Sequence, residues 1–140
     1  MIRENQQIIP IEASMLLPKV KEMFDNGYRL VQIGCTKLEN NELTYAFDKD
    51  YNFIYFKLIV APDSPKLPSI SSVYWCAFLY ENEIHDLYGV QFSGIAIDFH
   101  GNFYRTAQDK AFAYCERVAT PSKTASAVDQ TSSSSTGSSK

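Results

Sequence analysis

Hydrophobic and polar positions alternate along much of the first half of the chain, and this period of two predicts β-strands. The alternation runs through residues 28–37, 43–47 and 52–60, and strands at this spacing predict an antiparallel meander. A shorter apolar run over 7–11 predicts one further strand, and Pro10 favours an edge position for it because proline donates no ladder hydrogen bond. The predicted turns within the meander are Asn40-Asn41 and Asp48-Lys49-Asp50.

A helical period of hydrophobic positions marks residues 13–24. Leu16, Val20 and Phe24 recur at the spacing of one helix face, which predicts an amphipathic helix ended by Asn26-Gly27. Pro18 is tolerated only in a first turn, so the regular helix is expected to begin near Leu17.

A second helix is expected over about 72–88, capped by Ser71 or Ser72 and closed by Gly89. Trp75 and Leu79 extend its apolar surface almost all the way round the first half. A helix that is apolar on more than one side is normally buried on more than one side. One side is expected to meet the sheet, and the other needs a partner or a covering C-terminal segment.

The two helices and the meander together predict an α+β domain, an antiparallel meander sheet packed with two helices, over residues 1–119. The Ser- and Thr-rich residues 120–140 lack the apolar side chains of a core and are expected to form a disordered tail. Residues 62–68 read as a loop, 95–99 as a short strand and 111–115 as one more short element.

Composition narrows the function classes. The formal charge of −3 gives no basic face for nucleic acid or for an anionic membrane surface. The three cysteines, Cys35, Cys76 and Cys115, are too widely spaced for a disulfide framework or an iron–sulfur cluster held by this chain alone. No signal peptide pattern and no apolar run long enough to cross a membrane is present. A cytoplasmic location is therefore expected.

The end of the second helix carries the most unusual chemistry. Glu81, Glu83 and Asp86 fall in its last two turns with no Lys or Arg among them. Carboxylates are disfavoured there because the carboxyl end of a helix carries partial negative charge. The arrangement therefore suggests that these carboxylates serve a cationic partner or a metal.

Two interpretations of this cluster remain open at the level of the residues. Glu81 and His85 have the spacing of two metal ligands on one helix face, and His100 follows in the next loop. Alternatively, Glu81 pairs with His85 or Arg105, while Glu83 and Asp86 are solvated or meet a partner. The chain has no His-Glu-x-x-His pattern, phosphate-binding loop or Gly-x-Ser-x-Gly elbow, so it does not read as a free-standing enzyme.

The segment from Ser69 to Arg105 resembles the signature of the 30-kDa subunit family of respiratory complex I, the NADH-quinone oxidoreductase. That family has a Ser-Ile-Thr-like start and a helix that ends in Glu-Arg-Glu-x-x-Asp-Leu-Phe-Gly-Ile-x-Phe-x-Gly, followed by a His and an Arg. The order of helix, meander and helix also matches, and the resemblance covers about residues 7–106. The matching residues that it marks as motif or interface positions are Glu81, Glu83, His85, Asp86, Tyr88, Gly89, Phe92, Gly94, His100 and Arg105.

Two departures make the chain more similar to one branch of this family. Asn82 stands where the family usually has Arg, and residues 95–104 lack the usual His-Pro-Asp-Leu-Arg-Arg run. With the short length, these features resemble the small 30-kDa-type subunit of membrane-bound energy-converting [NiFe] hydrogenases of the Ech type.

The resemblance implies a cofactor-free, non-catalytic peripheral subunit on the cytoplasmic side of a membrane complex. Its partners would be a hydrogenase-like large subunit and an iron–sulfur small subunit, which carry the NiFe site and clusters. Such a complex couples ferredoxin oxidation and proton reduction to ion translocation. The equivalent 30-kDa-type component of an NAD(P)H- or ferredoxin-quinone oxidoreductase is one alternative, and a small metal-dependent enzyme using Glu81, His85 and His100 is another. On the interface interpretation, Glu83→Ala or Asp86→Ala leaves the isolated fold intact but weakens assembly.

Overall fold

A four-stranded sheet forms the centre of the computed structural model, which describes residues 5–113. Strands β2 (Arg29–Lys37), β3 (Asn41–Lys49) and β4 (Asn52–Val60) form the predicted antiparallel meander. Strand β1 (Asn5–Pro10) pairs with β4 in parallel, so the sheet order is β1-β4-β3-β2. The expected α+β class is confirmed, and Pro10 lies at the end of an edge strand as predicted.

The meander strands are longer than the sequence pattern indicated. Asn41 already lies opposite Lys37, so the first turn occupies 38–40. Strand β3 continues to Lys49, and the chain reverses at Asp50 and Tyr51, whose φ angles are 50° and 64°. Asn41, Asp48 and Lys49 were therefore wrongly predicted as turn residues. Arg29 on β2 holds Asp48 in the sheet, because the Arg29 Nε donates a hydrogen bond to the Asp48 carboxylate at 2.9 Å.

The first helix begins with a 3-10 turn, η1 (Ala13–Met15), and continues as α1 (Leu16–Asp25). Pro18 sits in the first turn of α1, as its missing N–H requires. Leu16, Val20 and Met23 form its buried face. The helix stops where Gly27 takes a φ of 78°, a conformation that glycine adopts without a steric penalty.

Helix α2 (Ala77–Tyr88) begins later than predicted. The preceding residues instead form successive turns, in which the Ile70 carbonyl accepts from Val73 and Tyr74 and the Tyr74 carbonyl accepts from Ala77. Ser71 does not cap the helix, because its hydroxyl accepts the Ala96 N–H at 2.9 Å. The end of α2 is as predicted: Gly89 is left-handed with φ 76°, and its N–H donates to the His85 carbonyl.

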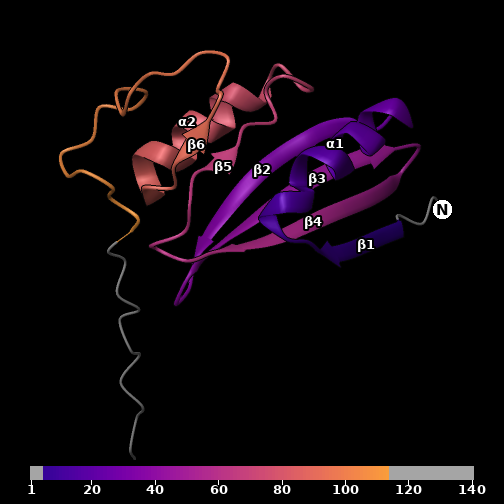
Figure 1. Ribbon diagram of the computed structural model, residues 1–140, viewed down its shortest axis with the longest axis horizontal. Coiled ribbons are helices and arrows are strands. Elements are labelled where there is room, and N and C mark those ends of the chain that lie inside the picture. Colours follow the sequence, from indigo (N-terminus) through magenta and orange to yellow (C-terminus); the bar gives the residue numbers. More distant parts are fainter. Residues whose placement is uncertain (1–4, 114–140) are drawn as a thin grey trace, which may run out of the picture.

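Both helices cover the same face of the sheet. Their buried residues join one hydrophobic core with Tyr45, Phe47, Phe56 and Leu58 from β3 and β4. Figure 1 shows α1 lying across the sheet and α2 further along, beside β2. The fold is thus two layers, and the opposite sheet face, which includes the 63% exposed Ile8, carries no helix from the described residues.

Two short parallel strands, β5 (Leu67–Pro68) and β6 (Phe92–Ser93), tie the chain on either side of α2 together. Part of the predicted loop 62–68 is thus a strand. The strand predicted for 95–99 is wrong: this segment is irregular, because its backbone groups bond to the side chains of Ser71, which precedes α2, and of Asn82 on α2 instead of to a neighbouring strand. From there the described chain runs outside α2 (Figure 1). None of the described helices has the length and apolar character needed to cross a membrane. Cys115 and the tail predicted for 120–140 lie outside the described residues.

Candidate functional site

Glu81 is fully buried and holds the chain that leads into α2. Its carboxylate accepts hydrogen bonds from the Ser69 hydroxyl at 2.5 Å and the Ile70 N–H at 2.8 Å. The predicted pairing of Glu81 with His85 or Arg105 is therefore wrong. Desolvation raises the pKa of Glu81 to about 7, and the two hydrogen bonds only partly oppose the shift. Its role in the isolated domain is structural.

Asn82 is also fully buried and fastens the irregular segment after β6 to α2. Its side-chain amide donates to the Phe78 carbonyl at 2.7 Å and the Ile97 carbonyl at 2.8 Å. Its side-chain oxygen accepts the Phe99 N–H at 2.9 Å. Asn82 thus fixes the path of residues 97–99. The pattern of charged residues along the chain does not indicate this role.

Asp86 fastens the next part of the same segment. It is 8% exposed, and its Oδ2 accepts the Tyr104 N–H at 2.8 Å. The expectation that Asp86 is solvated is wrong, and because of this bond we now expect Asp86→Ala to loosen the chain at Tyr104. Glu83 is half-buried and lies beside Tyr104. Desolvation, followed by the charge of Glu83, raises the pKa of the Tyr104 hydroxyl.

The two histidines do not join the acidic residues in a metal site. The His85 Nδ1 lies 3.0 Å from the Val90 carbonyl, so it bonds within the helix end. His100 is exposed, its φ is 51°, and its Nδ1 lies 3.4 Å from Asp98. Both line a hollow of about 240 Å³, but Glu81 faces Ser69 instead. Residues 5–113 contain no group of three His, Cys, Asp or Glu placed to hold a metal ion.

The remaining motif residues shape the end of α2. Gly89 closes the helix, and Phe92 is buried in β6. Gly94 takes a φ of 77° after that strand. Tyr88 stacks edge-on against Phe112 at 5.6 Å, so the last described residues cover this end of the helix. Arg105 is exposed and has no ion pair within the described part of the chain.

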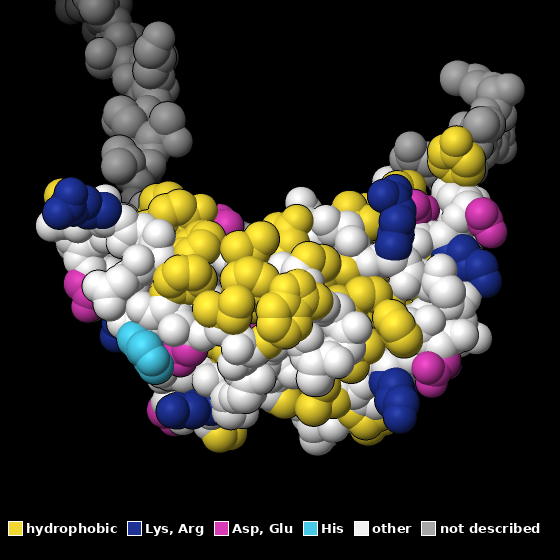
Figure 2. Space-filling model, turned by 90° about the horizontal axis from the view of Figure 1, so that it is seen from above, with side chains coloured by type: hydrophobic (Ala, Val, Ile, Leu, Met, Phe, Trp, Pro, Cys, Tyr) yellow, Lys and Arg dark blue, Asp and Glu magenta, His cyan; other side chains and the backbone are white. Residues whose placement is uncertain are grey.

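An uncovered apolar surface lies beside this site, and we call it the apolar face. Trp75 and Phe78 contact each other at 5.7 Å, while Phe24 from α1 packs edge-on against Tyr74 at 5.5 Å. The Asn82 side-chain amide donates to the backbone carbonyls of both Phe78 and Ile97, so the chain at Ile97 lies beside α2 at Phe78. In Figure 2, hydrophobic side chains gather across the middle of the face seen from above α2. The exposed members of the apolar face are Phe24, Trp75, Leu79, Ile97 and Phe99.

The apolar face is larger than the single exposed hydrophobic side chains that are common on protein surfaces. Trp75 is 62% exposed, Phe24 53% and Leu79 44%, and hydrophobic side chains lie next to one another across this face in Figure 2. Contiguous exposed apolar patches in soluble domains usually mark interaction sites. The second apolar side of α2 is thus uncovered by the described C-terminal segment, and a partner remains the expected cover.

Comparison with known proteins places this architecture. The profile of the family described as "Respiratory-chain NADH dehydrogenase, 30 Kd subunit" matches residues 9–101. Among curated proteins no match was found.

Two solved structures show the same fold. A trypsin-resistant fragment of Nqo5 is 18% identical with a TM-score of 0.57, over 64% of this chain and 80% of that one. A chain of the membrane-bound sulfane sulfur reductase is 20% identical with a TM-score of 0.61, over 71% of this chain and 64% of that one. The family match spans most of the described residues and includes both the meander and the acidic helix end. The chain belongs to the family of the 30-kDa subunit of the respiratory-chain NADH dehydrogenase.

Proposed function

We propose that this chain is a cofactor-free peripheral subunit of a membrane-bound oxidoreductase complex, which it joins through the apolar face. The observation that carries the proposal is the exposed apolar surface formed by Trp75, in the turns before α2, and Leu79 on α2, a helix whose other side is already buried in the core. Aromatic side chains of this kind are enriched at the centres of protein interfaces. Family membership supports a place in a multi-subunit complex, and one structural neighbour is described as part of an archaeal respiratory membrane complex.

The acidic motif supports assembly indirectly in this proposal. The side chains of Glu81, Asn82 and Asp86 form hydrogen bonds with the segments before and after α2. Asn82 thereby fixes the segment that carries Ile97 and Phe99, two members of the apolar face. Glu83 is the half-buried carboxylate of the motif, and it remains a candidate for a cationic group on a partner.

The finer proposal is that the complex is an energy-converting [NiFe] hydrogenase of the Ech type, on the cytoplasmic face of its membrane. Support comes from the two departures in sequence, Asn82 in place of Arg and the altered run over 95–104. Asn82 is fully buried and bonded within residues 97–99, so the two departures occur at one structural contact. The partners would be the hydrogenase-like large subunit and the iron–sulfur small subunit, and the chain itself would bind no cofactor.

A pull-down of the tagged chain from its native membranes under anoxic conditions tests both levels. Recovery of partner subunits with nickel, and hydrogen evolution from reduced ferredoxin, are expected. Partners linked to NADH or quinone without nickel would contradict the hydrogenase assignment and favour the alternative. A chain recovered alone with a stoichiometric metal would contradict the subunit proposal itself.

Matched variants test the apolar face. Trp75→Ser and Leu79→Ser are expected to keep the fold, because both side chains are exposed, and to reduce recovery of partners strongly. Ile8→Ser is the control, because Ile8 is 63% exposed on the opposite sheet face. Equal recovery with Trp75→Ser and Ile8→Ser would place the interface elsewhere.

A further inference from the structure

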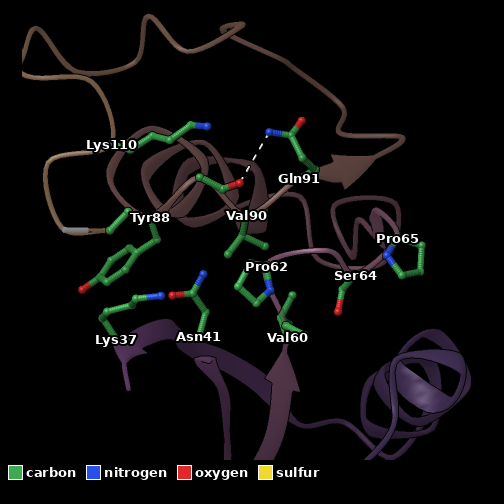
Figure 3. A pocket seen from close by; sticks show the side chains of 13 residues that line it. Lys37, Asn41, Val60, Pro62, Ser64, Pro65, Tyr88, Val90, Gln91 and Lys110 are labelled. Atoms are coloured by element: carbon green, nitrogen blue, oxygen red, sulfur yellow. Dashed lines mark hydrogen bonds between the residues drawn. The ribbon is translucent and has the colours of Figure 1, made fainter. Parts of the chain in front are cut away.

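A crevice of about 260 Å³ opens where the ends of three strands meet the end of α2. Its floor is formed by Lys37, Asn41 and Val60, which are the last or first residues of β2, β3 and β4. Tyr88, Gly89 and Val90 from the end of α2 lie above them, and Lys110 and Gln91 complete that side (Figure 3). None of the motif carboxylates belongs to this crevice.

The charge of the crevice is opposite to that of the chain. Lys37 and Lys110 both line it, and no Asp or Glu is among its described lining residues, although the whole chain carries a formal charge of −3. The described residues provide neither lysine with an ion pair. Lys110 also lies across Gly89, where its charge complements the end of the helix dipole. Lys37 has no such helix end of its own, so its charge is available to an anionic group of a ligand.

A buried acceptor at the same place is also unsatisfied. Asn41 is 8% exposed, and its side-chain oxygen has no hydrogen-bond donor among the described residues. Figure 3 shows the Asn41 side chain beside that of Lys37, below Tyr88 and Val90. Buried polar atoms of this kind are normally bonded, and a lone one requires an explanation. A ligand that offers an N–H donor as well as a negative charge would satisfy this oxygen and the two lysines.

The walls add a third requirement. Val60, Ala61, Pro62, Pro65 and Val90 give the crevice an apolar lining around its cations. Its volume lies below the roughly 300–1,000 Å³ of sites for drug-sized ligands, so a side chain or a chain end fits better than a cofactor. A peptide carboxyl terminus with an apolar last residue combines the charge, the N–H and the apolar surface.

We infer that this crevice binds the C-terminal carboxylate of a peptide segment, with Lys37 and Lys110 pairing with the carboxylate and Asn41 accepting a peptide N–H. That the segment belongs to a partner subunit rests on the proposed function, whereas the recognition of the carboxylate does not. The crevice would give the complex a polar contact in addition to the apolar face.

Titration of the isotope-labelled full chain with two tripeptides tests the inference. Acetyl-Ala-Ala-Leu with a free carboxylate is expected to shift the NMR signals of the Asn41 side-chain amide and the Gly89 and Gln91 N–H groups. The C-terminally amidated peptide is expected to bind at least about tenfold more weakly, the loss typical of one charge-assisted hydrogen bond. Equal shifts with both peptides would overturn the inference. Succinate or phosphate that binds as tightly as the free tripeptide would show a site for free anions and would also overturn it.

Charge-matched variants locate the site. Lys37→Met and Lys110→Met should each weaken binding of the free tripeptide about tenfold, whereas Lys21→Met, on the exposed side of α1, should leave it unchanged. Equal weakening by Lys21→Met would mean non-specific attraction and would refute the assignment. Loss of partners with Trp75→Ser but no tripeptide binding would reject this inference and keep the proposed function. Tripeptide binding without any recovered partner would reject the proposed function alone.

Discussion

Replacing Glu81 with Gln separates the charge of this buried carboxyl from its shape. The carboxyl is fully buried, and the groups that bond it are the Ser69 hydroxyl and the Ile70 N–H. The amide oxygen of Gln can keep the Ile70 bond. Its NH₂ group can donate to Ser69, whose hydroxyl lies 2.7 Å from that of Ser71 and can donate there. Glu81→Gln therefore preserves the network and removes one titrating group.

The size of the effect follows from the two pKa values. The pKa of Glu81 rises from an ordinary 4.5 to about 7 in the folded chain. Between these values the folded state binds a proton that the unfolded state has released, so the free energy of unfolding falls as the pH rises. At 1.36 kcal/mol for each pKa unit, the loss between pH 4.5 and pH 8 amounts to about 3 kcal/mol. Glu81→Gln lacks this loss.

Urea unfolding of both chains from pH 5 to pH 8.5 measures the difference. Glu81→Gln should be about as stable as the unaltered chain at pH 5 and more stable by about 3 kcal/mol at pH 8. Because other titrating groups are shared, they cancel in this difference. The exposed Glu39→Gln is the control for a lost negative charge and should give a curve parallel to the unaltered chain. A parallel curve for Glu81→Gln as well would refute the argument that Glu81 is held desolvated.

Further expectations concern the contacts around α2. Asn82→Ala should lower the free energy of unfolding by about 2–4 kcal/mol in urea titrations, because it leaves the Ile97 carbonyl and the Phe99 N–H without partners; unchanged stability would contradict the assignment. Asp86→Ala should speed hydrogen exchange of the Tyr104 N–H, with the Phe99 N–H, held by Asn82, as the internal reference. Gly89→Ala should destabilise more than Gly94→Ala in thermal unfolding. Both sites have φ near 77°, but only at Gly89 does a new Cβ come within 2.9 Å of Lys110 Cδ. Equal losses would mean that the Lys110 side chain moves aside from Gly89 without cost.

The sheet was largely predictable because its information is local. Alternating side chains marked β2, β3 and β4, and Pro10 marked the edge strand. The parallel partner of that strand was not predictable in the same way, since the pairing of Asn5 with Asn52 leaves no trace in either segment alone. The start of α2 was misjudged for a similar reason. Ser71 has the character of a helix cap, but its hydroxyl is used by Ala96, which lies far away in sequence.

In the candidate site, too, contacts between segments far apart in the sequence could not be predicted. The motif identified Glu81 and Asp86 as special, but their charge suggested external cations. Their partners are the Ser69 hydroxyl and the backbone N–H groups of Ile70 and Tyr104. Every residue except proline has such an N–H group, so the sequence contains no signal for these two backbone bonds. Exposure of Trp75 was foreseeable from an apolar surface wider than one helix face. The crevice at Lys37 and Asn41 was not, because several separate segments build it.

The parallel pairing of β1 with β4 has a consequence for folding. The meander forms from contacts close in sequence, whereas β1 must wait until β4 exists, and closing that long loop costs more chain entropy. Until β1 docks, β4 is an open edge with the run Asn52–Val60, which is rich in aromatic and β-branched residues. Such an edge recruits other chains in register. Strand β1, which has a polar start and a terminal proline, therefore protects the β4 edge from pairing with other chains. A change that delays the docking of β1 is expected to lower the yield of folded protein without altering the structure of the molecules that do fold.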